Sequence, residues 1–497
     1  MSYALLPYNI SLTLLTDLYQ LTMAYGYWKQ GKAEQEGVFN LFFRKNPFNS
    51  GYTIAAGLAY VIDFINNFKF SRDDIDYLHS ITGNDGNLLL ETSFLDYLNS
   101  LNLTVDIEAT PEGTVVFPQE PLVRVKGPLL QCQLLETALL NIINFNTLIS
   151  TKAARVCFAA EGDPVLEFGL RRAQGIDGGL SMSRAAYIGG CTSTSNVLAG
   201  KLYNIPVKGT HAHSWVMCFN TELEAFDAYA QAMPNNCIFL VDTYDTLQGV
   251  RNALIIGKKL KKNGHKMAGI RLDSGDLAFL SNEARILLDE AGFKDTLIFA
   301  SNDLDEHIIQ SLKRQGSKIA VWGVGTNLST AKDEPALGGV YKLTAIKENN
   351  RWKNKIKVSE QISKITNPGI QRTYRYLDNN GLALADIIYE EGYNLENGAV
   401  IVDPLSSLHQ RKIERGAQGF ELLVPVFRSG KCVYTQESLL TIRQRVREQL
   451  ALFHNGIKRF ENPHSYPVGL ERSLYKKKKR LISKIKKYNW EFQSDTK

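Results

Sequence analysis

The chain has 497 residues, of which 44% are hydrophobic and 22% are charged. These proportions are typical of a globular protein of two or three domains and exclude an intrinsically disordered chain. The formal net charge is +6, but eight lysines and arginines lie between Lys476 and Lys487, so the remaining residues carry a net charge of −2. A nearly neutral body argues against the broad basic face that nucleic-acid binding requires, and we interpret the tail as a solvated run of charge.

The first 20 residues lack a basic region followed by an apolar core, so we expect no export and a cytoplasmic location. The six cysteines form no CxxC pair and have no histidine at zinc spacing, which predicts reduced thiols.

Residues Thr16–Trp28 have the spacing of an amphipathic helix, in which Tyr19 either fills the core or contacts a ligand. Arg44 lies in the turn Phe43–Phe48, where it either reaches an anion or is solvated.

A β pattern follows at Glu112–Pro128, and Leu129–Ser150 is the most apolar long window. Its apolar residues fall at helical spacing and are interrupted by glutamines, a glutamate and asparagines, so a buried helix is expected rather than a membrane span. From residue 151 to 345 short β-branched runs alternate with amphipathic segments such as Leu277–Ala291 and Leu304–Arg314, which predicts parallel strands with helical crossovers. The expected strands are Val165–Phe168, Ile205–Gly209, Cys237–Asp242, Met267–Asp273, Leu297–Asn302 and Ile319–Gly323.

Polar residues stand at the carboxyl ends of these expected strands, and no GxGxxG follows the first one. In (β/α) barrels the functional groups gather on that face, one strand at a time, so we expect an irregular, incomplete (β/α) barrel rather than an open doubly wound sheet. The strand-end residues are Glu167, His211 and His213, Asp242, Asp273, Asn302 and Gly323.

The last third is β-rich at Tyr374–Tyr376, Leu382–Tyr389, Gly398–Val402 and Phe420–Phe427, and ends in a helix over Glu437–Phe453. We therefore expect an α/β protein in which a mixed α/β domain, built from the N-terminal and later C-terminal segments, accompanies the barrel. The expected segments are residues 1–150 (mixed α/β), 151–345 (barrel with the site), 346–455 (β-rich, packing on the first two) and 456–497 (extension with the basic tail).

Three motifs carry chemistry on the expected barrel. The stretch Val165–Val216 combines a double arginine, glycines, hydroxyls and His-x-His-Ser, which suits a phosphate-bearing substrate and a histidine that exchanges protons or phosphate. Arg271 with two carboxylates, Asp273 and Asp276, at one strand end suits a magnesium-complexed diphosphate, although an Arg–Asp ion pair closing the loop is the alternative. Ser301 and Asn302 either cap the next helix or, with Gly323, Gly325 and Thr326, form a phosphate cradle.

These segments, in this order from about residue 10 to 470, resemble the nicotinate phosphoribosyltransferase family. The resemblance rests on nine stretches: TDLYQLTMAYGYW, the EGTVVFPQEPLVRVKGP-to-TKAARV block, LEFGLRRAQG, TSNVLAG, AHS, RLDSGDL, SNDLDE, GVGTNL and VPVFRSGK. It implies a type II phosphoribosyltransferase that works as a head-to-tail homodimer, without nucleic-acid or membrane partners. The implied reaction joins nicotinate to phosphoribosyl pyrophosphate, giving nicotinate mononucleotide and pyrophosphate, the entry step for NAD from nicotinic acid. It also implies ATP as a co-substrate and a requirement for Mg²⁺.

The resemblance further assigns residues to roles. Phe168 and the partner subunit's Tyr19 would sandwich the pyridine ring, with Arg171 beside its carboxylate. Arg271 and Asp273 would hold the ribosyl phosphates and the ribose–metal region, with Mg²⁺ bound through phosphates and Asp273 the one carboxylate assigned near it. His213 would be phosphorylated by ATP, although a histidine at a strand end is otherwise often structural. The remaining assigned positions are Asn196 and Ser214 for substrate, and Arg44, Ser301, Asn302, Gly323, Gly325 and Thr326 for phosphate.

Three alternatives stay open from the sequence. Nicotinamide phosphoribosyltransferase shares the fold, but the resemblance places neutral Asn196 where that relative has an aspartate, which would repel a carboxylate substrate. Quinolinate phosphoribosyltransferase is shorter and lacks the ATP histidine. A non-enzymatic protein that binds nucleic acid or a membrane surface through the basic tail is the third, and the slightly acidic body argues against it.

Overall fold

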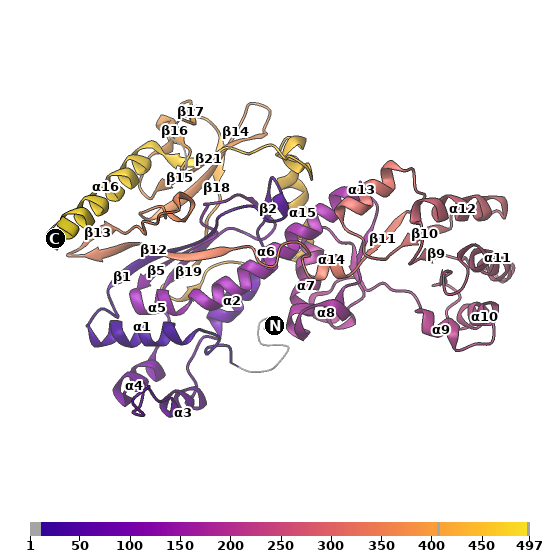
Figure 1. The fold of residues 1–497 in the computed structure, drawn as a ribbon, viewed down its shortest axis with the longest axis horizontal. Helices are drawn as coiled ribbons and strands as arrows, with labels where there is room; N and C mark the ends of the chain where they lie inside the picture. Colours follow the sequence, from indigo (N-terminus) through magenta and orange to yellow (C-terminus); the bar gives the residue numbers. More distant parts are fainter. Residues whose placement is uncertain (1–10, 405–407, 495–497) are drawn as a thin grey trace. The chain divides into compact units, whose positions relative to one another are not determined.

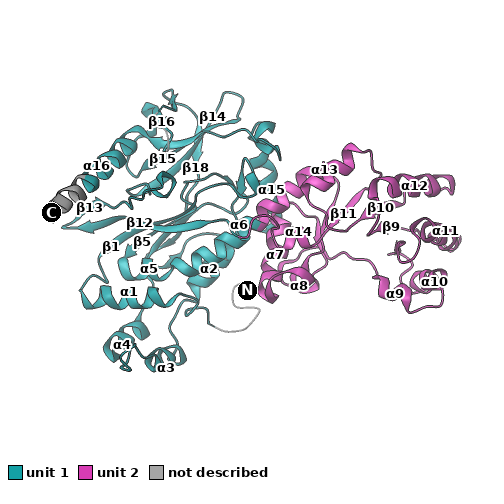
Figure 2. Ribbon diagram, viewed as in Figure 1, with its two compact units in different colours: residues 1–148, 336–497 teal, residues 149–335 magenta. Residues whose placement is uncertain are grey.

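The computed structural model of the chain describes residues 11–404 and 408–494 (Figure 1). The chain divides into two compact units: residues 1–148 with 336–497, and residues 149–335 (Figure 2). The first unit is therefore discontinuous in sequence, because the chain leaves it for the whole of the second unit and then returns.

The first unit contains a seven-stranded sheet in the order β13-β12-β1-β5-β3-β19-β20. Strand β1 lies inside this sheet because its apolar side chains are buried, and it pairs antiparallel with β5 on one side and with β12 on the other. The seven strands are β1 (Glu36–Phe43), β3 (Asp106–Ala109), β5 (Val123–Pro128), β12 (Gly339–Glu348), β13 (Arg351–Asn354), β19 (Val424–Arg428) and β20 (Lys431–Cys432).

A six-stranded sheet, in the order β17-β16-β21-β15-β14-β18, completes the β structure of this unit together with the pair β2–β4. The β structure predicted over Phe420–Phe427 is confirmed, and it divides into β18 and β19, which belong to different sheets. The strands are β2 (Thr53–Ile54), β4 (Val115–Val116), β14 (Gln371–Leu377), β15 (Ala383–Glu390), β16 (Ala399–Val402), β17 (Gln410–Ile413), β18 (Gly419–Glu421) and β21 (Val468–Glu471).

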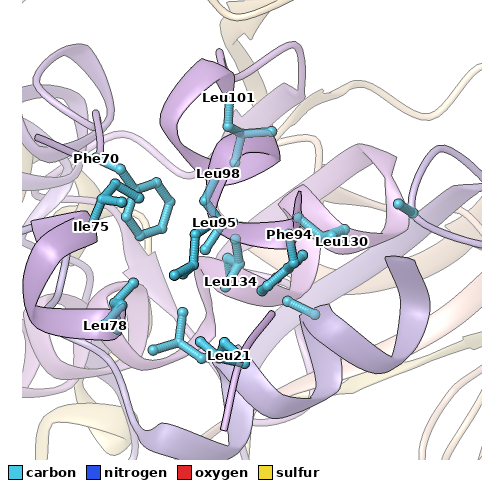
Figure 3. Close-up of a cluster of buried hydrophobic side chains, with 13 residues drawn as sticks. Leu21, Phe70, Ile75, Leu78, Phe94, Leu95, Leu98, Leu101, Leu130 and Leu134 are labelled. Atoms are coloured by element: carbon cyan, nitrogen blue, oxygen red, sulfur yellow. The ribbon is translucent and has the colours of Figure 1, made fainter. Parts of the chain in front are cut away.

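Helices of the first unit cover these sheets. Four of them pack around a leucine- and phenylalanine-rich cluster that includes Leu21, Phe94, Leu98 and Leu134 (Figure 3). The helices are α1 (Leu18–Lys29), α2 (Leu58–Asn66), α3 (Arg72–Ser80), α4 (Thr92–Ser100), α5 (Leu129–Leu134), α15 (Leu439–Ala451) and α16 (Arg472–Ser494), and α6 (Glu136–Ala159) continues into the second unit. In the described part of the chain no helix is long and apolar enough to span a membrane.

The basic tail departs from the prediction of a solvated run. It belongs to α16, where Lys478 is only 5% exposed and donates a hydrogen bond to Asn367 Oδ1 at 2.8 Å. Burial lowers the pKa of Lys478 to about 8. One lysine of the run therefore packs in the fold, because the helix turns its neighbours Lys477 and Lys479 to other directions.

The second unit is built on a six-stranded parallel sheet in the order β7-β6-β11-β10-β9-β8, with helices on its flanks (Figure 1). The expected α/β architecture and five of the six expected strands are confirmed; Ile205–Gly209 contributes only a single parallel bridge, Val207 to Thr194. The strands are β6 (Val165–Glu167), β7 (Ser193–Thr194), β8 (Ile238–Leu240), β9 (Gly269–Leu272), β10 (Leu297–Ala300) and β11 (Val321–Val324). The helices are α7 (Gly175–Gly189), α8 (Val197–Tyr203), α9 (His213–Met217), α10 (Glu222–Ala232), α11 (Thr246–Lys262), α12 (Leu277–Glu290), α13 (Glu306–Arg314) and α14 (Thr326–Ser329).

Candidate functional site

The carboxyl ends of the parallel strands bring most of the predicted site residues to one edge of the second unit. The register aligns Leu272 with Ala300, Ala300 with Trp322 and Val324 with Glu167, so the residues that follow these strands lie side by side. This edge is where α/β proteins bind ligands.

Arg271, on β9, connects three other segments at this edge. Its Nε donates to Ser301 Oγ at 2.8 Å, its Nη1 to Thr210 Oγ1 at 2.9 Å and its Nη2 to Asp273 Oδ1 at 2.9 Å. The ion pair named as the alternative therefore exists. A guanidinium has five N–H hydrogens, so two remain for a ligand beyond these three bonds, and a structural pair and phosphate binding are compatible.

Asp273 is held by two side chains of the site. It accepts hydrogen bonds from Arg271 and from the Ser301 hydroxyl. Burial alone would raise the pKa of Asp273, but Arg271 and Ser301 outweigh burial and hold that pKa below its ordinary value. Asp273 is therefore an anion at neutral pH.

A second carboxylate, Asp242, lies directly after β8. Its Oδ2 accepts from the backbone N–H of Asp273 at 2.9 Å and from Ser274 Oγ at 2.5 Å. Its Oδ1 is buried and has no hydrogen-bond partner among the described residues. The sequence reasoning noted Asp242 only as a strand-end residue and assigned it no role; its place next to Asp273 follows from strand order, which the sequence does not state.

Phe168 forms an aromatic platform against two glycines. The guanidinium carbon of Arg271 lies 5.6 Å from the centre of its ring. A Cβ added to Gly323 would come within 2.8 Å of the Phe168 ring, and one added to Gly325 within 3.3 Å of the Phe168 carbonyl oxygen. These two positions are glycine because β6 and β11 approach each other so closely beneath the ring.

The proposed phosphate cradle follows β10 and β11. Ser301 is buried, whereas Asn302 is exposed and has a φ of 91°, an uncommon conformation for a non-glycine residue. Neither caps the next helix, because α13 is capped by Asp305, whose side chain accepts from two backbone N–H groups. The helix-cap alternative is therefore wrong. Thr326 opens the short helix α14, whose first backbone N–H groups have no partner within the helix.

Glu167 corrects an expectation from the sequence. It was predicted to stand at an exposed strand end, but it is 1% exposed and accepts from the Gly169 N–H and from the hydroxyls of Ser183 and Thr194. Burial raises the pKa of Glu167, although these hydrogen bonds oppose the shift. The carboxyl group thus joins the end of β6 to α7 and β7, a role that the sequence signals only by a glutamate in an apolar run.

Asn196 lies in the same network and caps α8. Its Oδ1 accepts from the Ala199 N–H at 3.1 Å, and its Nδ2 donates to Ser183 Oγ at 3.2 Å and to Gly179 O at 3.3 Å. The side chain is 2% exposed. Its amide is therefore engaged within the fold, and its influence on a substrate stays a prediction.

His213 opens α9 beside Asp273. Its Nδ1 lies 3.2 Å from Thr243 Oγ1, and its Nε2 lies 3.7 Å from Asp273 Oδ2, which is too long for a hydrogen bond. If Nδ1–H donates to Thr243, Nε2 presents a free lone pair. Ser214 is the next residue and is exposed. Thr243 and Thr210 were missed by sequence reasoning, because a lone threonine in a loop has no pattern.

Three predicted site residues remain: Arg171, Tyr19 and Arg44. Arg171 is exposed in the short helical turn Leu170–Arg172 after β6. Tyr19 and Arg44 belong to the first unit, Tyr19 on α1 with 48% of its surface exposed and Arg44 directly after β1. Arg44 Nε is buried with no hydrogen-bond partner in the described residues. Their participation in the site stays a prediction.

Comparison with known families matches three consecutive parts of the chain. The N-terminal domain of nicotinate phosphoribosyltransferase matches residues 14–144, the nicotinate phosphoribosyltransferase family matches residues 165–381, and the C-terminal domain matches residues 370–478. A nicotinate phosphoribosyltransferase of Bacillus subtilis is 44% identical over 480 residues, covering 96% of each chain. One of Caenorhabditis elegans is 38% identical over 93% of this chain and 92% of its own.

Solved structures agree with these matches. Human nicotinic acid phosphoribosyltransferase superposes with a TM-score of 0.82 at 32% identity, covering 94% of this chain and 99% of its own. A nicotinate-nucleotide pyrophosphorylase of Pyrococcus furiosus superposes with a TM-score of 0.66 at 22% identity, covering 89% of this chain and 96% of its own, which shows a shared fold.

The close approach at Gly323 can be tested by stability. Gly323→Ala forces a methyl group against the Phe168 ring, and we expect it to lower the free energy of unfolding by about 1–3 kcal/mol. Gly178→Ala in helix α7 is the matched control: a Cβ there meets nothing within 4 Å, so it should be neutral or stabilising by up to about 1 kcal/mol. Urea unfolding measures both; equal effects would mean that the contact imposes no constraint.

Proposed function

The chain belongs to the nicotinate phosphoribosyltransferase family, and on that premise we propose that it joins nicotinate to phosphoribosyl pyrophosphate, giving nicotinate mononucleotide and pyrophosphate. The observation that carries the proposal is the convergence of Arg271, Asp273 and Ser301 with the Phe168 platform at one sheet edge. The pyridine nitrogen attacks the anomeric carbon of the ribose as the bond to pyrophosphate breaks, and the electron pair leaves with pyrophosphate. Such a displacement depends on positioning and electrostatics more than on a strong base.

Different side chains suit different parts of the two substrates. Phe168 offers the pyridine a flat apolar face, and the exposed guanidinium of Arg171 suits the carboxylate of nicotinate. Ser301, Asn302, Gly323, Gly325 and Thr326 suit the 5′-phosphate, since hydroxyls and unpaired backbone N–H groups bind phosphate oxygens. The two N–H hydrogens left on Arg271 suit the departing pyrophosphate.

The donor set also fits Mg²⁺. Asp242 and Asp273 lie together, and Asp242 Oδ1 is a buried acceptor to which no described residue donates a hydrogen bond. Mg²⁺ commonly binds one or two carboxylates and takes its other ligands from substrate phosphates and water, so two carboxylates at this edge suffice. When bound, Mg²⁺ would neutralise charge on the pyrophosphate.

The six free thiols are consistent with a cytoplasmic location.

A neutral His213 whose Nδ1–H donates to Thr243 would present Nε2 as a nucleophile, and this arrangement supports coupling to ATP. In this proposal the γ-phosphoryl group moves to Nε2 as its bond to ADP breaks, and water later cleaves the N–P bond to release phosphate. The phosphohistidine would add about two negative charges next to Asp273 and the metal region. It would bias pyrophosphate binding and release without entering the bond exchange at the ribose.

Exposed apolar side chains support a homodimer with shared sites. Several lie in the first turns or loops after the strands of the second unit, and α1 of the first unit exposes Leu18, Tyr19 and Met23. Apolar surface of this kind is typical of an interface. Those of the second unit near the strand ends include Ile176, Val197, Leu198, Tyr244 and Phe279.

The substrate is tested by incubating the purified protein with phosphoribosyl pyrophosphate, Mg²⁺ and either nicotinate or nicotinamide, with and without ATP, and separating the products by chromatography. We expect nicotinate to be strongly preferred. Arg171→Ala should weaken transition-state binding for nicotinate by about 2–4 kcal/mol, because it removes a guanidinium–carboxylate pair. Arg172→Ala, next to it and equally exposed, is the control. Equal turnover of nicotinamide by the wild type would contradict the assignment.

The shared site is tested by mixing inactive variants. Subunit exchange between Tyr19→Ala and Asp273→Ala should restore up to about a quarter of wild-type activity, since half of the dimers are mixed and each owns one intact site. Phe168→Ala mixed with Asp273→Ala is the control that must stay inactive, because both residues belong to the second unit. No recovery after confirmed exchange would exclude a site completed by the partner.

ATP coupling is tested at His213. His213→Ala should keep a slow phosphoribosyl transfer that ATP no longer accelerates, and its ATP hydrolysis should fall to background. Wild type incubated with γ-labelled ATP should give an acid-labile, base-stable protein phosphate that the variant lacks. His307→Ala, an exposed histidine elsewhere in the same unit, should label like wild type. A labelled His213→Ala protein would place the coupling residue elsewhere.

A further inference from the structure

The parallel sheet of the second unit has two edges, β7 and β8, and the segment before His213 reaches both. At β7, Thr194 N–H donates to Pro206 O and Lys208 N–H donates to Thr194 O, both at 3.0 Å. Residues 206–208 therefore extend the sheet by a short piece of backbone pairing.

At β8 the closing contact is made by a side chain. Val241 N–H donates to Arg271 O of β9, so the N–H of Leu240, one residue earlier, points to the free edge. There it donates to His211 Nε2 at 3.2 Å. One histidine thus supplies the acceptor that a neighbouring strand would supply in a closed barrel.

Burial and neighbouring groups fix the position and the protonation state of the His211 ring. It is 8% exposed, and its ring centre lies 4.9 Å from that of Tyr229 and 6.0 Å from that of Phe226. Its Nδ1 lies 3.3 Å from Ala212 O, which places the proton on Nδ1 and the lone pair on Nε2. Burial lowers the pKa of His211, and the neighbouring Arg271 and His213 lower it further, so the ring is neutral at pH 7.

We propose that His211 is a positioning residue, whose Nε2 closes the parallel sheet into a ring and so fixes the two site residues beside it, Thr210 and His213. Thr210 accepts from Arg271 Nη1, and His213 stands opposite Asp273. Without the acceptor at position 211, the backbone of this segment is anchored only at β7, and Thr210 and His213 keep only their side-chain contacts with Arg271 and Thr243 to hold them near β9. The part that concerns His213 rests on the proposed function.

Hydrogen exchange at the Leu240 amide tests the closure without any assay of activity. His211→Leu fills a similar space but has no acceptor, whereas His211→Gln places Oε1 near the position of Nε2. We expect His211→Leu to lower the protection of Leu240 at least tenfold, His211→Gln to stay within about threefold of wild type, and Ile270 on the interior strand β9 to be unchanged in both. Equal loss in both variants, or none in His211→Leu, would overturn the proposal.

The wild-type protein alone provides a second test. Imidazole in the open segment has a pKa of about 6.5, whereas that of the closed state is lower. As pH falls below about 6.5, the open state binds the proton first, and protection of Leu240, corrected for intrinsic exchange, should fall until the lower pKa is passed. Arg271, His213 and Tyr229 are the ionisable groups around the ring. His211→Gln should show no such fall; a pH-independent wild type would contradict the closure.

The effect on the site is read from the labelling of His213 by ATP. His211→Leu should slow labelling at least tenfold and change the KM for nicotinate less than twofold, and His211→Gln should restore the rate. A purely structural role would instead lower all activities together. If wild type does not label at all, the proposed phosphohistidine fails, but the exchange measurements still decide whether His211 closes the ring.

Discussion

The guanidinium of Arg271 connects the parts on which the site depends. It binds Ser301 after β10, Asp273 after its own strand and Thr210 in the closing segment, and one face of the group lies over Phe168 at the end of β6. A planar group with donors in fixed directions sets these four segments relative to one another. The same fixed geometry is needed to bind a phosphate-bearing ligand in one orientation.

Charge at this edge is nearly balanced rather than strongly positive. Asp242 and Asp273 offset Arg271, and the body of the protein is slightly acidic. Bare phosphates would meet two carboxylates here, whereas a magnesium–diphosphate complex arrives with its charge largely neutralised. The site therefore suits a metal-complexed anion better than a free one, and backbone N–H groups and hydroxyls supply the remaining contacts.

Much of this was predictable from sequence, because parallel strands place their carboxyl ends together whatever the details of packing. Strand positions, the α/β class and the grouping of Arg271 and Asp273 with the residues after β10 followed from that rule, whereas Phe168 was assigned only through the family resemblance. The burial of Glu167 could not be predicted from this rule, because its hydrogen-bond partners Ser183 and Thr194 come from other elements. The splitting of Phe420–Phe427 and the loss of Ile205–Gly209 as a strand depend on which edges are free, and that is a tertiary property.

The discontinuous first unit has a consequence for synthesis on the ribosome. Strand β1 finds β5 early, but its other neighbour, β12, is made only after the whole of residues 149–335. At 5–20 residues per second, the roughly 300 residues between β1 and β12 take about 15–60 s to synthesise, and one edge of β1 stays unpaired for that time. The unpaired backbone N–H and C=O groups of an apolar strand can pair with other nascent chains. The yield of folded protein in cells therefore depends on how well chaperones shield this strand until β12 is made.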